Sequence, residues 1–92
     1  TKVFSGKNPK TTLTALQYFV KRGDVVLVDY LAGNTMQDGH YVVFQGKKDN
    51  DITIWDPSLG KNTSLSIPYF ISHWKDKTED GKVMKYWALI IS

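Results

Sequence analysis

Residues 38–57, with the sequence DGHYVVFQGKKDNDITIWDP, contain two runs of β-branched and aromatic residues on either side of a polar stretch with glycine. Such runs are typical of strands, and a short polar connection between two of them is typical of a hairpin. We therefore expect strands over residues 40–45 and 51–55, joined by a turn over residues 46–50. Pro57 cannot donate a backbone hydrogen bond, so it should end the second strand.

The register of this hairpin follows from its apolar residues. One face must be apolar, because a shift of one residue would move every side chain to the other face. Pairing Phe44 with Ile52 meets this requirement. The same register pairs Val42 with Ile54, so four large apolar side chains share one face.

Extended by two residues, this register sets His40 opposite Asp56 on the apolar face. The Cβ atoms of directly opposed residues lie about 4.5–5.5 Å apart, so an imidazole and a carboxylate can share a hydrogen bond there. This is the base-plus-orienter arrangement of nucleophilic hydrolases. An aspartate before a proline also often does no more than open a turn. Spacing alone leaves both interpretations open.

Before the hairpin, residues 11–22 should form an amphipathic helix, because their apolar residues recur at helical spacing. Thr11 or Thr12 can cap its N-terminus, and Gly23 follows as a stop signal. The apolar positions of this helix are Leu13, Leu16, Phe19 and Val20.

The other elements are short. The β-branched run at residues 25–31 predicts a buried strand, and a polar loop should follow over residues 32–39. After the hairpin we expect, in order, a turn at residues 58–62, a strand at 63–67, a helix at 68–74 with proline in its first turn, a charged turn at 75–82 and a last strand at 83–91. Short strands separated by tight turns favour an antiparallel sheet, and helices on one face of it would make an α+β domain.

The composition sets outer limits. The chain has 92 residues, of which 41% are hydrophobic, so we expect one domain or half-domain over residues 1–92. The net charge of +3 comes from scattered lysines, and no nucleic-acid partner is expected. No stretch approaches the roughly 18 apolar residues of a membrane span. With no cysteine, the chain has no disulfide, no zinc–thiolate site and no thiol nucleophile of its own.

Two segments carry a resemblance to a known family. Residues 38–46 (DGHYVVFQG), residues 52–57 (ITIWDP) and Gly60 resemble the C39-like, bacteriocin-processing group of papain-like cysteine peptidases. In that family a His-Phe/Tyr-Val-Val strand precedes a strand that ends in Asp-Pro, with a glycine shortly after. Residues 68–74 (PYFISHW) resemble the family's aromatic-and-Trp segment. The likeness spans most of residues 12–91, and Asp24-Val25 stands where the family usually has proline.

The resemblance implies the C-terminal half of a papain-like peptidase, with His40 as general base and Asp56 orienting it. The family's nucleophilic cysteine opens a helix well upstream and follows a glutamine that serves the oxyanion hole. Neither has a match here, and Gln37 and Gln45 lie in the wrong half for that glutamine. The chain has no initiator Met, and we expect it to come from something longer. Two interpretations remain: part of an active peptidase, or an inactive relative that binds a peptide or protein.

The expected partners follow from this resemblance. The substrate would be a peptide or protein, with a Gly-Gly-type site as in the bacteriocin-processing relatives, and no cofactor or metal is implied. His40 and His73 are too far apart in sequence for a strong metal signal. If no helix covered the apolar hairpin face, the missing N-terminal half or a second copy would bind there. The expected setting is extracytoplasmic, or a domain of a larger bacterial protein.

One aromatic cluster could serve either structure or binding. Tyr30, Tyr41 and Trp55 are expected on the sheet face opposite His40. Such a cluster can be a packing surface for a helix or a platform for a peptide.

Overall fold

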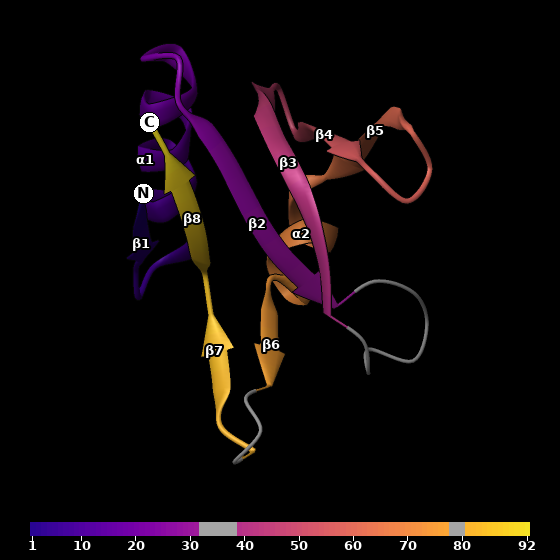
Figure 1. Ribbon diagram of the computed structural model, residues 1–92. Helices are drawn as coiled ribbons and strands as arrows, with labels where there is room; N and C mark the ends of the chain where they lie inside the picture. Colours follow the sequence, from indigo (N-terminus) through magenta and orange to yellow (C-terminus); the bar gives the residue numbers. More distant parts are fainter. Residues whose placement is uncertain (32–38, 78–80) are drawn as a thin grey trace.

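The computed structural model describes residues 1–31, 39–77 and 81–92, which form eight strands and two helices (Figure 1). In chain order these are β1 Lys2–Ser5, α1 Pro9–Lys21, β2 Val25–Leu31, β3 Gly39–Lys48, β4 Asp51–Asp56, β5 Lys61–Ser66, α2 Ile67–His73, β6 Lys75–Lys77, β7 Val83–Lys85 and β8 Trp87–Ile91. Six strands form one sheet in the order β1-β8-β2-β3-β4-β5, and β6 pairs with β7. Every pairing is antiparallel, so the prediction of an antiparallel α+β domain is confirmed.

Helix α1 begins two residues earlier than its apolar spacing predicts. The cap is Asn8, not Thr11 or Thr12, and its side-chain oxygen accepts hydrogen bonds at 2.9 and 3.2 Å from the backbone N–H groups of the second and third helical residues. Asparagine is among the best N-caps, and the fixed φ of Pro9 suits a first helical turn. Gly23, at φ +95°, ends the helix as predicted. No helix within the described ranges is long and apolar enough to span a membrane.

The predicted hairpin forms, but its register differs from the predicted one. Phe44 pairs with Ile54, not with Ile52, and the turn consists of Asp49 and Asn50 alone. The strands therefore run further than their apolar residues suggest, and the predicted turn over residues 46–50 was wrong. The turn lies further along the chain than predicted, and one extra residue in β3 changes the register by one residue between the turn and Phe44.

This extra residue forms a β-bulge at Gln45 and Gly46, where the register shifts. Gly46 has φ +143°, a backbone conformation that residues with a side chain rarely adopt. Pairing with β2 ends at Phe44, so the next part of β3 lacks a strand on that side. Gln17 of α1 takes its place: its amide oxygen accepts from the Lys47 N–H at 2.8 Å, and its amide nitrogen donates to the Lys47 carbonyl at 3.4 Å. The bulge is therefore held by a helix that is distant in sequence.

Replacing Gln17 by alanine should lower the free energy of unfolding by about 1 kcal/mol, because two hydrogen bonds to the β3 backbone are lost. The matched control is Thr14→Ala on the same helix, since the Thr14 hydroxyl donates only to the carbonyl of Lys10 within α1. This control should change stability by less than about 0.5 kcal/mol. Urea unfolding of the three proteins measures both effects, and equal midpoints for the Gln17 and Thr14 variants would contradict the assignment.

The inner face of the sheet carries the core. Alternate residues of the central strands are at most 2% exposed, namely Val26, Val28, Val42, Phe44, Ile52, Ile54, Ala88 and Ile90. The side chains packed on them are Leu13, Leu16 and Phe19 of α1, Phe70 of α2 and Trp74, which directly follows α2. Both helices lie on the same side of the sheet (Figure 1). The apolar hairpin face, for which we expected a partner if it stayed open, is therefore covered by the chain's own helices.

The C-terminal part departs most from prediction. The charged turn expected over residues 75–82 contains β6, which pairs with β7. The single strand expected over residues 83–91 is interrupted at Tyr86, whose φ is +55° and whose N–H donates to the Trp74 carbonyl at 3.1 Å. Strand β1 was not predicted at all. Of the loop predicted over residues 32–39, Gly39 begins β3, and the others, Gln37 among them, lie outside the described residues.

Candidate functional site

His40 and Asp56 come from neighbouring strands and meet at one end of the sheet. The distance between His40 Nε2 and Asp56 Oδ1 is 2.9 Å. Because Val43 pairs with Trp55, Asp56 lies across from Val42, and the contact to His40 is diagonal instead of directly across. Long side chains can bridge such diagonal positions. The predicted contact is thus present although the predicted register was wrong, since a shift of two residues keeps a side chain on the same face.

The Asp56 carboxylate is held at the end of β4 by a turn. Its side chain is 9% exposed, and Oδ1 accepts a hydrogen bond from the Ser58 N–H at 2.9 Å. Burial by itself would raise the pKa of Asp56. The hydrogen bonds from His40 and from the backbone N–H groups of Ser58 and Leu59 outweigh burial, so the pKa of this carboxyl lies below its ordinary value. The group is therefore an ionised acceptor at neutral pH.

An ionised carboxylate can only accept hydrogen bonds, so the hydrogen between the two side chains belongs to Nε2 of His40. In the neutral ring, Nδ1 is then the nitrogen that can take up a proton. No group among the described residues forms a hydrogen bond with this Nδ1. The His40 side chain is 23% exposed, so a reacting group can approach it. The pair has the geometry of a base with an orienting carboxylate.

The other flank of His40 is occupied by Tyr30 of β2. Tyr30 and His40 are paired across the strands, and their rings lie 5.8 Å apart at 64°. Burial, and then the negative charge of Asp56, raises the pKa of Tyr30. We expected Tyr30 on the opposite face with Tyr41 and Trp55, and this was wrong, because residues paired across two strands share a face. Tyr41 and Trp55 do lie on that opposite face, 50% and 37% exposed.

The remaining candidates lie elsewhere. No cysteine occurs in the sequence, so the pair has no thiol partner within this chain. His73 lies in α2, where its ring stacks on Tyr69 at 4.1 Å and its Nδ1 is 2.8 Å from the Ser72 hydroxyl. Over the part of the chain that the structure describes, no three His, Asp or Glu side chains are grouped so that they could hold a metal ion.

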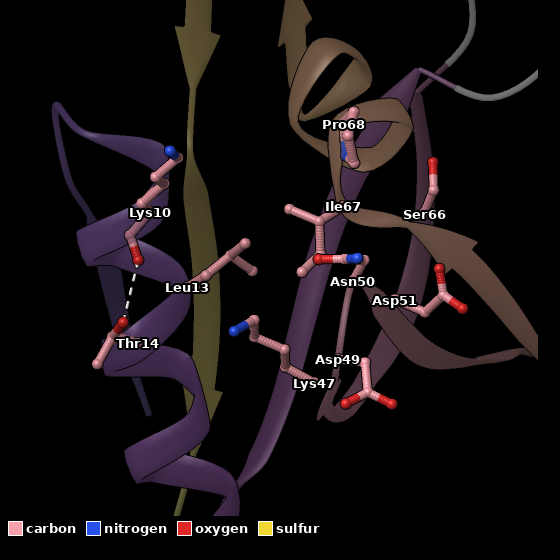
Figure 2. Close-up of a pocket in the computed structure, with 10 residues that line it drawn as sticks. All are labelled: Lys10, Leu13, Thr14, Lys47, Asp49, Asn50, Asp51, Ser66, Ile67 and Pro68. Carbon is pink, nitrogen blue, oxygen red and sulfur yellow. Dashed lines mark hydrogen bonds between the residues drawn. The ribbon is translucent and has the colours of Figure 1, made fainter.

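A cavity of about 570 Å³ lies at the end of β3 opposite to His40 (Figure 2). Its apolar walls are Leu13 of α1 and Ile67 and Pro68 of α2. In Figure 2 the Lys47 amine points toward Leu13, whereas the Asp49 carboxylate points away from it. The residues that line this cavity are Lys10, Leu13, Thr14, Lys47, Asp49, Asn50, Asp51, Ser66, Ile67 and Pro68. Neither His40 nor Asp56 is among them, so the cavity and the pair are separate features.

Sequence reasoning missed two parts of the site. The backbone N–H groups that hold Asp56 follow Pro57, and the Asp-Pro sequence was a usable signal for such a turn. Tyr30 had no comparable signal, because β2 is a nearly continuous apolar run and its pattern does not distinguish its two faces.

Asp56→Asn should lower the free energy of unfolding by about 1–2 kcal/mol at pH 7, since a charge-assisted hydrogen bond becomes a neutral one. The pKa of Asp56 is lowered in the folded state, so its contribution is fully present above the unfolded value of about 3.9 and is lost as the pH falls through the folded value. The difference between wild type and variant should therefore shrink below about pH 4.

Urea unfolding of both proteins between pH 3 and pH 7 measures this difference. Asp51→Asn is the control, because Asp51 is an exposed residue of the same strand. A wild-type advantage over Asp56→Asn that stays constant down to pH 3 would contradict the ionised, hydrogen-bonded state of Asp56.

Comparison with known proteins gives one match. A family model described as the peptidase C39 family matches residues 6–78. This range contains both His40 and Asp56 and every element from α1 to β6. No curated protein and no solved structure matches the chain.

Proposed function

Because this chain belongs to the peptidase C39 family, we propose that it provides the histidine and aspartate of a cysteine-peptidase-like hydrolase that acts on peptides. In this proposal His40 is the general base and Asp56 orients it, in a papain-like arrangement. The nucleophilic cysteine comes from a polypeptide segment outside this sequence. The observation that carries the proposal is the 2.9 Å contact between His40 Nε2 and the buried, ionised Asp56 carboxylate.

The chemistry follows from that contact. The thiol of the second segment gives its proton to Nδ1 of His40, and the thiolate attacks the carbonyl carbon of the scissile peptide bond. The imidazolium formed in this step is stabilised by Asp56. It then gives the proton to the leaving amine, the peptide bond breaks, and a thioester remains. Water, deprotonated by the same nitrogen, hydrolyses the thioester and restores the thiol. The family resemblance favours a Gly-Gly sequence at the cleavage site.

The second candidate is an inactive member of the family that binds a peptide or protein. The observations that favour it are the absence of cysteine and the cavity at the far end of β3. Its apolar walls and the Lys47 amine suit an apolar side chain next to a carboxylate. In this case His40 and Asp56 would serve the stability of the sheet end.

The test is a peptidase assay with a Gly-Gly-containing peptide. The chain is assayed alone, and again after co-expression with the polypeptide encoded directly upstream of it. The proposal expects no thiol-dependent cleavage by the chain alone, since removal of a triad nucleophile costs several orders of magnitude in rate. It expects cleavage, blocked by a thiol-alkylating reagent, in the co-expressed sample.

Two outcomes would contradict the proposal. One is cleavage by the chain alone that survives repurification and thiol alkylation. The other is a folded, co-expressed complex that contains no cysteine and does not cleave. In the second case, saturable binding of the same peptide would favour the binding module if Lys47→Glu weakens it and Tyr41→Asp does not.

A further inference from the structure

The imidazole of His40 is contacted from two sides. Strand β3 lies between β2 and β4 in the sheet. Asp56 of β4 holds Nε2 through one hydrogen bond, and Tyr30 of β2 packs its ring against the imidazole at 5.8 Å and 64°. One hydrogen bond restrains a single atom and leaves the plane of the ring free to turn. A second contact on the opposite flank restrains the plane as well.

Tyr30 is itself firmly held. It is 6% exposed, and its ring lies 6.1 Å from that of Phe70 in α2. Phe70 in turn lies 4.9 Å from Trp74, whose indole N–H donates to the Trp87 carbonyl of β8 at 2.9 Å. Phe70 and Trp74 are completely buried. A row of rings thus connects the His40–Asp56 pair to α2 and to β8, and Tyr30 is its last member before His40.

The ring of Tyr30 matters here, not its charge. Burial raises the pKa of its hydroxyl, so the phenol stays neutral near pH 7 and has no charge to offer His40. Among the described residues no hydrogen bond joins the Tyr30 hydroxyl to either member of the pair. An edge-to-face contact between rings is favourable in its own right and depends on their orientation. A phenylalanine at this position should therefore keep the ring contact to His40, whereas an aliphatic side chain should lose it.

We propose that Tyr30 is a positioning residue, whose ring holds the His40 imidazole in the orientation that directs Nε2 to Asp56 and leaves Nδ1 for the reacting group. The inference rests on the proposed function, in which His40 is the base. It adds a third side chain to the two that were predicted, and it explains why an aromatic residue stands directly across the strands from His40.

The test is the tautomer of His40, measured on the chain itself by long-range ¹H–¹⁵N NMR of the imidazole at a pH where the ring is neutral. His40→Gln assigns the signals, and His73 serves as an internal reference. The wild type should be mainly the Nε2–H tautomer. Tyr30→Leu should raise the population of the other tautomer by about fivefold, the factor that the loss of one aromatic contact implies. Tyr30→Phe should match the wild type, as should the control Tyr41→Leu on the opposite face.

A second measurement does not depend on how the variants fold. In the wild type, nuclear Overhauser effects should connect the Tyr30 ring protons with the carbon-bound protons of the His40 ring. The absence of these effects would overturn the proposal, and so would a folded Tyr30→Leu variant with an unchanged tautomer ratio. Neither readout requires peptidase activity. If His40 responds to Tyr30 but the co-expressed complex does not cleave the peptide, only the proposed function is overturned.

Discussion

Replacing His40 by alanine should lower kcat of the co-expressed peptidase by at least about 10³-fold. In the proposed mechanism the imidazole takes the thiol proton and returns it to the leaving amine, so both steps lose their proton carrier. Asp56→Ala should also lower kcat, by at least about 10²-fold, because it removes the carboxylate that holds Nε2 at 2.9 Å. Steady-state kinetics on a Gly-Gly peptide measures both effects.

His73→Ala is the matched control for this prediction. His73 is the other histidine of the chain, and its contacts to Tyr69 and Ser72 lie within α2. This variant should retain kcat within about threefold, as expected for a substitution away from the reacting groups. If His40→Ala folds and keeps the wild-type rate, His40 is not the base. Equal losses for His40→Ala and His73→Ala would also contradict the assignment.

Phe44→Ala should lower the free energy of unfolding by about 3–5 kcal/mol, because it leaves a cavity at the centre of the inner sheet face. Phe44 is 1% exposed and lies in the core under α1 and α2. The total free energy of unfolding of a chain of this length is roughly 5–14 kcal/mol, so such a loss is a large part of it. The melting temperature should fall by roughly 15–30 °C, which calorimetry or circular dichroism would measure.

Two further variants make this prediction informative even if Phe44→Ala does not fold. Phe44→Leu keeps most of the volume and should cost only about 1–2 kcal/mol. Tyr41→Ala removes a larger side chain from the same strand, but this side chain is 50% exposed on the opposite face, so the loss should be about 1 kcal/mol. If Tyr41→Ala destabilises the chain as much as Phe44→Ala, the two faces have been assigned the wrong way round.

The site was predictable because side chains alternate along a strand. The predicted register was displaced by two residues at Phe44, yet His40 and Asp56 stayed on one face, since two residues complete one period of the strand. An error of one residue would have separated them. The bulge was not predictable in the same way. A glycine inside a strand can signal a bulge, but Gln17, which holds this one, is 30 residues away from Lys47.

Local signals also explain which elements could be predicted. Helical spacing and the β-branched run indicated α1 and β2, because each pattern lies within one short segment. Strands β1, β6 and β7 are each only three or four residues long and have no such pattern. They exist because other strands pair with them. The break at Tyr86 is of the same kind, since its N–H bonds to Trp74, 12 residues earlier.

We could predict from the amino-acid sequence the kinds of the main elements, the antiparallel α+β class, the shared face of His40 and Asp56, and the absence of a thiol nucleophile in this chain. These follow from periodicity and composition, which are local properties. Three features became visible only in the folded chain: the diagonal contact of the pair, the place of Tyr30 beside His40 and the covering of the hairpin face by α1 and α2. These depend on which distant segments pack together, and burial of apolar area, not local propensity, makes that choice.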